Sequence, residues 1–214
     1  MNIIIQNKIP FNAHFVRNTT LLKYDTDSHK YEPDTVSFVK FDPDNKKDFE
    51  AIDKLKNKWQ DSILISHVKK CGTRMIKKDP YANGANIFAV TSQTEDFDNL
   101  DPKKILSLAQ TENVGYKKIY LRAIERNPEN NEYKKIGTAT INALKEEYNK
   151  ITLNSLKEAV DFYIHCGFKK KSNDANEFYW RKSLPKRIQE KHLFSHIHQY
   201  FDRIFNKAER PSQD

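Results

Sequence analysis

One short stretch of the 214-residue sequence has the composition of an anion-binding loop. Residues 132–137, Glu-Tyr-Lys-Lys-Ile-Gly, precede small and apolar residues that are expected to begin a helix. A helix N-terminus presents unpaired backbone N–H groups and the positive end of the helix dipole, and a glycine lets an anion approach the main chain closely. We therefore expect this loop to hold a pyrophosphate, with two lysines adding positive charge, although a plain strand-to-helix turn would have the same pattern. The residues of this candidate site are Tyr133, Lys134, Lys135, Ile136, Gly137 and Thr138.

The hydrophobic pattern on both sides of the loop predicts a mixed α/β domain. Apolar runs predict strands over residues 35–41, 86–91, 105–110, 118–124, 150–153 and 177–181. Three- and four-residue spacing of apolar side chains predicts helices over residues 49–59, 136–148, 155–165 and 185–208. Residues 113–115 are expected to form a tight hairpin connection, and Gly167 is placed to end a helix. Three successive strands therefore precede the loop and its helix, and a strand and a further helix follow them.

A second segment has a distinctive spacing of residue types. Ala159, Tyr163, Gly167 and Phe168 form the pattern A-x-x-x-Y-x-x-x-G-F. This pattern, together with the order of the elements, resembles the GNAT superfamily of N-acyltransferases, in which this helix packs beside the pantetheine arm of acetyl-coenzyme A (acetyl-CoA). The tyrosine of the signature commonly protonates the departing thiolate, so the resemblance gives that role to Tyr163. A tyrosine that only packs in the core would occupy the same position of an amphipathic helix.

The loop resembles the same superfamily, with departures. The family pattern is Arg or Gln, two variable residues, Gly, one further residue, and then Gly or Ala; Gly137 matches the last position. Glu132 and Lys135 stand where the family has its first residue and its middle glycine, and a lysine restricts positive φ. Leu156 stands where the family usually has an asparagine that contacts the coenzyme arm. The resemblance covers residues 105–168.

The resemblance implies both a fold and a reaction. The fold is a mixed sheet with an antiparallel first half and two strands splayed apart around acetyl-CoA. In the reaction an amine attacks the thioester directly, and a backbone N–H near Ile124 or Glu125 polarises the carbonyl oxygen. A tyrosine hydroxyl has a pKa of about 10, close enough to that of a thiol for proton donation from Tyr163. Glu125 is the first candidate for the base that takes the proton of the amine and Glu112 is the second, although both also suit an exposed surface.

A net charge of +8 leaves a function of another class open. A catalytically silent GNAT-like module would use this charge to bind nucleic acid or an acidic protein, and the departures at Glu132 and Lys135 favour that alternative. Against it, the basic runs lack the interleaved aromatic residues of a single-strand binder: 69–70, 77–78 and 169–171. An acetyltransferase acting on an RNA-bound or ribosomal substrate would combine both functions. The expected partners are acetyl-CoA and an unidentified amine acceptor; nucleic acid is less favoured, and a homodimer is compatible with the sequence.

The sequence predicts one GNAT-like acetyltransferase domain over residues 1–184, in which residues 1–34 are an extension of uncertain structure, followed by an amphipathic helix and tail over residues 185–214. That helix is expected to pack on the domain, although its basic residues also suit a membrane surface or a partner. Cys71 and Cys166 have no metal-ligand spacing, so we expect no structural metal and a reducing, cytoplasmic environment. No apolar run is long enough to be a signal peptide or to cross a bilayer.

Overall fold

The computed structural model describes three stretches of the chain, 14–41, 85–172 and 176–183, together with single positions 48, 50, 52, 54, 55, 59 and 64. The chain divides into two compact units, Met1–Arg181 and Lys182–Asp214. Every element named below belongs to the first unit. The helix predicted over residues 185–208 lies outside the described residues.

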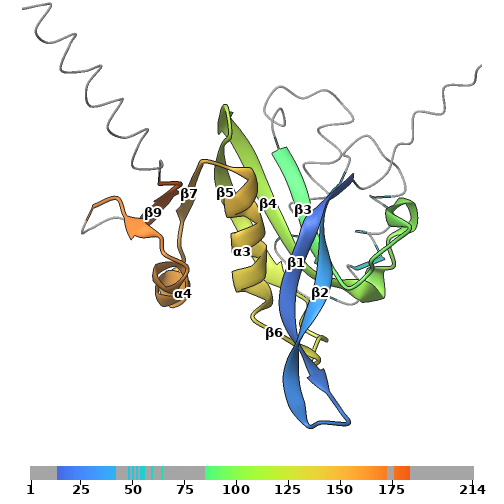
Figure 1. Cartoon of the computed structure of the whole chain (residues 1–214). Coiled ribbons are helices and arrows are strands. Elements are labelled where there is room, and N and C mark those ends of the chain that lie inside the picture. The colour runs from blue at the N-terminus through green and yellow to red at the C-terminus, as the bar shows by residue number, and fades with distance from the viewer. Residues whose placement is uncertain are drawn as a thin grey trace, which may run out of the picture. The chain divides into compact units, whose positions relative to one another are not determined.

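Within the described residues, nine strands form one sheet in the order β6-β1-β2-β3-β4-β5-β7-β9-β8 (Figure 1). The strands are β1 (His14–Asp25), β2 (Lys30–Phe41), β3 (Ala85–Thr91), β4 (Ile105–Gly115), β5 (Lys118–Arg126), β6 (Tyr133–Lys134), β7 (Lys150–Asn154), β8 (Lys169–Lys170) and β9 (Glu177–Arg181). All neighbouring strands are antiparallel except β5 and β7, which are parallel. The predicted mixed sheet with an antiparallel first half is therefore confirmed.

Helices and helical turns connect these strands. They are α3 (Ile136–Glu147), α4 (Val160–His165), η2 (Phe97–Asn99), η3 (Pro102–Lys104) and η4 (Lys157–Ala159). None of the helices in the described stretches combines the length and the apolar character that crossing a membrane requires. The predicted α3 boundaries agree with the structure to within one residue.

The strand predicted over residues 35–41 is confirmed as the second half of β2, but the sequence pattern does not predict β1 or the first half of β2. In the structure, residues 14–25 mix exposed and buried positions without a regular alternation, and Pro33, which cannot donate a hydrogen bond to a neighbouring strand, lies in the first half of β2. Pairing across the β1–β2 hairpin nevertheless runs from His14 to Asp25, and β6 adds hydrogen bonds at the other edge of β1. The Asp25 carboxylate closes the turn by accepting hydrogen bonds from two backbone amides, those of Asp27 (3.2 Å) and Ser28 (3.0 Å). Hydrogen bonds to neighbouring strands, and not the local hydrophobic pattern, therefore determine the extended conformation of these residues.

Two predicted boundaries are wrong. Residues 113–115 belong to β4, and the connection to β5 consists of Tyr116 and Lys117 alone, with Lys117 at φ 49°. The helix predicted over residues 155–165 is divided into η4 and α4. Its start is delayed because the Ser155 amide donates a hydrogen bond to the Asn176 carbonyl (2.8 Å), which keeps this residue in line with β7. Gly167 ends α4 at φ 77°, as predicted.

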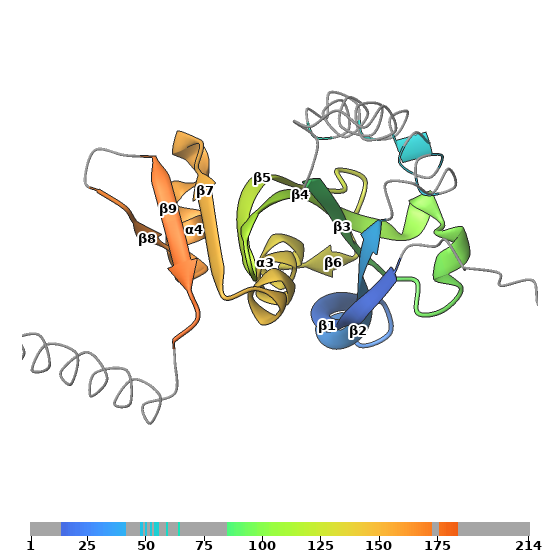
Figure 2. The ribbon, with the colours of Figure 1, turned by 90° about the horizontal axis from the view of Figure 1, so that it is seen from above.

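Apolar side chains cover one face of the sheet and, on the other face, the strands β2, β3 and β4. On one face, α3 and α4 pack through residues such as Leu144 and Tyr163 against Leu121 and Leu153. On the other face, a second cluster joins Ile52, Leu55 and Trp59 to the strands β2, β3 and β4. Figure 2 shows α3 on one side of these strands and the described positions between 48 and 64 on the other.

The predicted amphipathic helix over residues 49–59 is confirmed where it is described. Positions 48, 50, 52, 54 and 55 are helical, and the Trp59 amide donates to the Leu55 carbonyl (2.8 Å) with the four-residue spacing of a helix. Ile52, Leu55 and Trp59 are buried, as one apolar face requires. Phe49, the fourth residue of that face, lies outside the described residues.

Candidate active site

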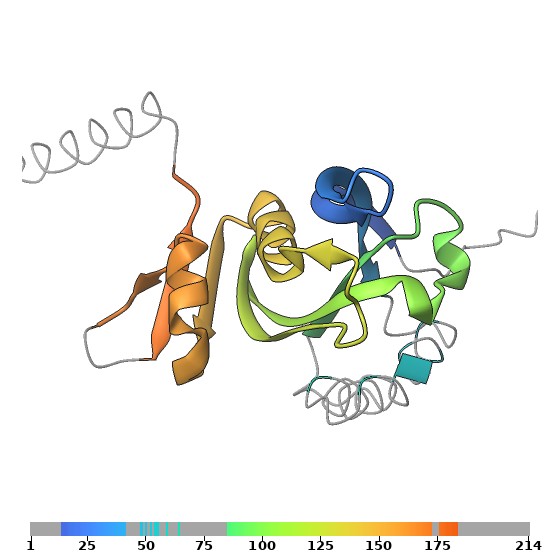
Figure 3. The same ribbon diagram turned by 90° about the horizontal axis from the view of Figure 1, so that it is seen from below.

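The sheet opens between β5 and β7. The two strands pair in parallel only where Lys118–Leu121 faces Lys150–Leu153. From residue 122 to Arg126, β5 continues alongside β4, but no strand of the described chain pairs with its other edge. Figures 1 and 3 show β7 drawing away from β5 beyond the paired stretch. Because backbone polar groups of a strand point alternately to its two edges, this part of β5 directs main-chain groups into the opening.

The N-terminus of α3 lies at the open end of this pair of strands. The Asn149 amide, just after α3, donates to the Lys117 carbonyl (2.8 Å), so the C-terminus of α3 lies beside the start of β5. α3 therefore runs antiparallel to β5 and begins near the end of that strand (Figure 1). The loop that was predicted to hold a pyrophosphate is thus placed beside the opening rather than at the closed end of the strands.

The first turn of α3 has the geometry of an anion cradle. Lys135 is the N-cap residue, its carbonyl accepts a hydrogen bond from the Ala139 amide (3.0 Å), and its side chain makes no capping hydrogen bond. The amides of Ile136, Gly137 and Thr138 accordingly have no acceptor within the helix. Lys135 adopts the left-handed conformation, φ 60° and ψ 24°. The lysine thus takes the positive φ that a glycine usually provides, at a cost of roughly 1–2 kcal/mol.

Tyr133 and Lys134 have a different place in this loop. Both residues form β6 and pair with β1, so their main chain continues the sheet edge. The Tyr133 hydroxyl donates a hydrogen bond to the Asp34 carboxylate (2.8 Å), and burial together with that carboxylate raises the pKa of Tyr133. The Lys134 ammonium lies 3.8 Å from the centre of the Tyr31 ring. These two residues anchor the loop to the β1–β2 hairpin, and the amides without an acceptor in the helix are those after Lys135.

Gly137 lies where α3 and α4 meet. A Cβ atom at this position would stand 3.2 Å from Cζ and 3.4 Å from Cε2 of Phe162, which is close contact for any side chain. At the other end of the two helices, the Lys145 ammonium donates to the Cys166 carbonyl. The lack of a side chain at Gly137 therefore serves helix packing as well as access to the main chain.

Tyr163 is buried in an aromatic cluster on α4. Its ring packs edge-on against Phe162 and Phe168, with centroid distances of 5.1 Å and 5.6 Å, and near Phe178 of β9. Only 7% of the residue is exposed, and burial, with a smaller contribution from Cys166, raises the pKa of Tyr163 to about 12. The hydroxyl consequently keeps its proton at neutral pH. The position is that of a core aromatic residue, and it also keeps the hydroxyl protonated, as the predicted acid requires.

Ile124 and Glu125 lie in the part of β5 that β7 does not pair with. The side chains of consecutive strand residues point to opposite faces, and Ile124 packs against the cluster of α3 and α4. The Glu125 carboxylate is on the other face, is partly buried, and accepts a hydrogen bond from the Leu64 amide (2.9 Å). The structure therefore places one candidate oxyanion donor and the first candidate base together at the opening.

Glu112 is engaged elsewhere. Its carboxylate accepts two hydrogen bonds from Arg122, from Nε (2.7 Å) and from Nη2 (2.8 Å), which is the bidentate geometry of a strong arginine–carboxylate pair. Arg122 also lies over the ring of Tyr120, 4.8 Å from its centre. Glu112 thus belongs to an ion pair on β4 and β5, and it is the weaker of the two candidate bases.

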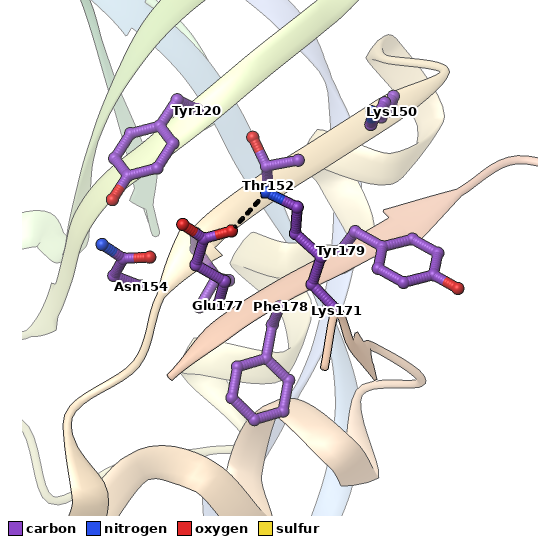
Figure 4. A pocket seen from close by; sticks show the side chains of 9 residues that line it. Tyr120, Lys150, Thr152, Asn154, Lys171, Glu177, Phe178 and Tyr179 are labelled. Atoms are coloured by element: carbon purple, nitrogen blue, oxygen red, sulfur yellow. Dashed lines mark hydrogen bonds and ion pairs between the residues drawn. The ribbon is translucent and has the colours of Figure 1, made fainter. Parts of the chain in front are cut away.

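A buried thiol and a cavity are two further features of the described stretches. Cys166 is a free and buried thiol whose pKa is raised by burial. In the stretches that the structure describes, no group of three or more His, Cys, Asp or Glu residues is placed to hold a metal ion. A cavity of about 470 Å³ lies away from the loop, on β5, β7 and β9 (Figure 4). Sequence reasoning did not identify that cavity, because its lining is assembled from three strands and from Lys171, which follows β8.

The structure has the GNAT acyltransferase fold. Its elements follow in the order that the resemblance implies: three antiparallel strands, a loop that opens α3, strand β7, helix α4 and the Gly167–Phe168 pair. The parallel β5 and β7 separate beside the N-terminus of α3, as the splayed strands of that fold do.

No model of a protein family matches the chain, and no curated protein matches it. Solved structures similar to it include a chimera of the spermidine N-acetyltransferase SpeG from Vibrio cholerae and hSSAT, with 16% identity, a TM-score of 0.45, and coverage of 68% of this chain and 95% of that one. The PaiA N-acetyltransferase of Thermoplasma acidophilum, in complex with coenzyme A, has 15% identity and a TM-score of 0.41 over 69% of this chain and 99% of that one. Tetrahymena GCN5 has 10% identity and a TM-score of 0.41 over 67% and 94% of the two chains.

Proposed function

We propose that this chain is an N-acetyltransferase that transfers the acetyl group of acetyl-CoA to an amine of a small molecule or a protein. The observation that carries the proposal is the opening between β5 and β7, beside the uncapped N-terminus of α3. A helix N-terminus and an unpaired strand edge together offer main-chain donors both to a phosphate and to an extended amide-bearing arm.

The fit of acetyl-CoA rests on the first turn of α3. The amides of Ile136, Gly137 and Thr138 would bind the pyrophosphate, and the exposed Lys135 adds positive charge beside them. The coenzyme supplies the thioester from which the acetyl group is transferred. The two departures from the family loop are compatible with this role, because Lys135 has the positive φ of a glycine and Glu132 contributes its backbone carbonyl to a hydrogen bond from the Tyr24 amide (2.8 Å).

Three groups are assigned to the reacting end of the opening. A backbone N–H at Ile124 or Glu125 would donate to the thioester carbonyl oxygen as negative charge develops on it. Glu125 would take the proton of the attacking amine, directly or through water. Tyr163 would donate a hydrogen bond to the departing thiolate. Because its pKa of about 12 exceeds the value of roughly 8.5 for a thiol, complete proton transfer from Tyr163 is uphill, and solvent completes the protonation.

The compartment and the acceptor belong to the proposal as well. The free Cys166 thiol is compatible with a reducing cytoplasm. Glu125 faces the side of the sheet opposite α3 and α4, so the acceptor amine would approach from that side while the coenzyme is held from the helix side. The class of amine is to be identified by a screen after coenzyme binding has been established.

The proposal is tested by the thermal midpoint of the purified chain with and without acetyl-CoA, since a ligand that binds only the native state raises this midpoint. We expect a clear rise at millimolar acetyl-CoA for the natural chain. Gly137→Glu should abolish the rise, because it places a carboxylate beside the pyrophosphate. Gly137→Ala is the matched control: it introduces the same Cβ atom near Phe162 without the charge, and most of the rise should remain. No rise for the natural chain would refute the enzymatic proposal.

A further inference from the structure

The face of β5, β7, β9 and β8 that points away from α3 and α4 carries a row of cations. Lys118 pairs with Lys150, and Lys150 pairs with Arg181, so these three residues stand side by side on adjacent strands. All three are exposed. Side chains in direct cross-strand register share one face of a sheet, and like charges there destabilise the pairing. None of the three forms an ion pair with a carboxylate in the described stretches.

Two tyrosines lie in the next row of the same face. Tyr120, Thr152 and Tyr179 are in register on β5, β7 and β9, and Lys169 of β8 pairs with Tyr179. The residues between these rows point the other way and are buried under α3 and α4: Ile119, Ile151, Leu153 and Phe178. The two rings are separated by one intervening strand, or roughly 10 Å.

A third row completes this surface, which we call the basic sheet face. Asn154 of β7 is in register with Glu177 of β9, and Lys171 donates its ammonium to the Glu177 carboxylate at 2.6 Å. Figure 4 shows the cavity of about 470 Å³ that lies among Tyr120, Lys150, Tyr179 and the Lys171–Glu177 pair. Beside Tyr120, Arg122 of β5 lies over the tyrosine ring and pairs with Glu112 of β4. In the described stretches, the basic sheet face thus presents six cationic side chains and two carboxylates, and each carboxylate is already paired with a cation, Glu177 with Lys171 and Glu112 with Arg122.

We propose that the basic sheet face binds a single-stranded nucleic acid. Phosphates would lie along the row Lys118–Lys150–Arg181 and beside Lys169, and bases would stack on Tyr120 and Tyr179. Proteins that bind single-stranded nucleic acid combine positive charge along the phosphate backbone with aromatic rings on which successive bases stack. A duplex hides the faces of its bases, and an acidic protein would use the cations but not the two rings.

This proposal does not depend on acetyl transfer. Tyr120, Lys150 and Arg181 lie on the closed half of the β5–β7 pair or at the end of β9, whereas the candidate coenzyme site is at the open half and the α3 N-terminus. The two sites can therefore fail or succeed separately.

The charge arm of the test uses the full chain and fluorescein-labelled 12-nucleotide oligouridine, with binding followed by fluorescence anisotropy at several salt concentrations. The double variant Lys150→Glu/Arg181→Glu should weaken binding at least tenfold. It should also reduce the slope of log K against log salt by about 1.4, because each lost phosphate contact on a single strand removes about 0.7. Lys103→Glu/Lys104→Glu is the control with the same change of charge on exposed residues of η3, and its dissociation constant should stay within twofold.

The second part of the test removes one aromatic ring without changing the net charge of the protein. Tyr120→Leu should weaken oligouridine binding about tenfold, which is within the range for loss of one stacked base. Tyr116→Leu, at a tyrosine that is 86% exposed on the β4–β5 turn, should leave binding unchanged. Oligothymidine of the same length tests whether the 2′-hydroxyl contributes. The thermal shift with acetyl-CoA is measured on every variant to show that it folds and that the coenzyme site is separate.

Several results would overturn the proposal. They are the absence of binding at about 100 μM protein in low salt, equal weakening by the η3 control, and unchanged binding of Tyr120→Leu. Competition by polyglutamate as effective as that by oligouridine would indicate an acidic protein partner instead. Equally tight binding of a duplex and of the single strand would also contradict the proposal, because the bases of a duplex cannot stack on the two tyrosine rings.

Discussion

The two edges of β5 differ in how far they are paired. On one edge β4 follows β5 from Lys118 to Arg126, so the antiparallel ladder covers the whole strand. On the other edge β7 follows it for four residues and then separates. In the closed half, the side chains that point toward α3 and α4, such as Ile119 and Leu153, are at most 1% exposed, whereas Ile124 and Glu125 at the open half are only partly buried. One strand thus serves as a rigid scaffold along one edge and as a ligand-facing edge along part of the other.

The largest expected effect comes from weakening the closed half. Leu153 is 1% exposed and pairs with Leu121, so Leu153→Ala should lower the free energy of unfolding by about 3 kcal/mol. The matched control is Leu156→Ala two residues beyond β7, where the side chain is 75% exposed and the change should stay within about 0.5 kcal/mol. Urea denaturation measures both. A loss below about 1 kcal/mol for Leu153→Ala would mean that the closed half does not hold the two strands together.

Alkaline pH should reveal how far the Tyr163 hydroxyl is buried on α4. Its pKa is raised from 10.0 to about 12, so the neutral hydroxyl stabilises the fold fully below pH 10 and this contribution is lost as pH rises toward 12. The loss amounts to at most about 2.7 kcal/mol for a shift of two units. Tyr163→Phe should therefore show a shallower decline of unfolding free energy between pH 10 and 12 than the natural chain. Parallel declines of the two proteins would show that the hydroxyl is hydrated.

The open half should respond in activity rather than in stability. Glu125→Gln keeps an oxygen that can accept the hydrogen bond from the Leu64 amide but removes the base, so kcat should fall at least tenfold at neutral pH. The rise in thermal midpoint with acetyl-CoA should be unchanged. Glu112→Gln is the control, because this carboxylate is held by Arg122, and its kcat should stay within about twofold. A larger loss for Glu112→Gln than for Glu125→Gln would reverse the assignment of the base.

The smallest effect concerns the strained residue at the start of α3. Lys135 has φ 60°, so Lys135→Gly should relieve backbone strain and raise the free energy of unfolding by about 0.5 kcal/mol, after the greater entropy of glycine in the unfolded chain is subtracted. Lys134→Gly one residue earlier, within β6, should instead lower it by a similar amount. Thermal or urea unfolding separates the two. Destabilisation by Lys135→Gly would show that the lysine side chain, and not its conformation, is what the loop needs.

Several strands and the helix around the candidate site could be predicted from the sequence, because burial of one face imposes a regular spacing of apolar residues. The strands β3, β7 and β9 and the helix α3 were located to within one or two residues, since their apolar side chains repeat with the period of the element. β1, the first half of β2 and β6 could not be located this way. β6 and β1 lie at the edge of the sheet, where polar residues are tolerated and hydrogen bonds to a neighbouring strand decide the conformation.

The basic sheet face shows a different limit of sequence reasoning. Along the chain, Lys169 to Lys171 have no aromatic residue among them, so a single-strand binder was disfavoured. Across the strands, Lys169 stands beside Tyr179, and Lys150 lies between Lys118 and Arg181. Residues that are tens of positions apart become neighbours about 5 Å apart when strands pair, and no local pattern encodes which strands do so.

The sequence by itself determined the mixed α/β class, the order of the longer strands and helices from β3 to β9, and the loop that opens α3, because each of these depends on local periodicity and on residues near one another in the chain. It also determined that Gly167 ends a helix, whereas the roles of Gly137 and Tyr163 are predictions from the family resemblance. Only the tertiary structure decided that Lys135 would adopt a positive φ, that Tyr133 would be tied to Asp34, and that β7 would leave β5 after four residues. Those outcomes depend on long-range pairing and packing, which balance small differences in free energy over many residues and are therefore not contained in any short stretch of sequence.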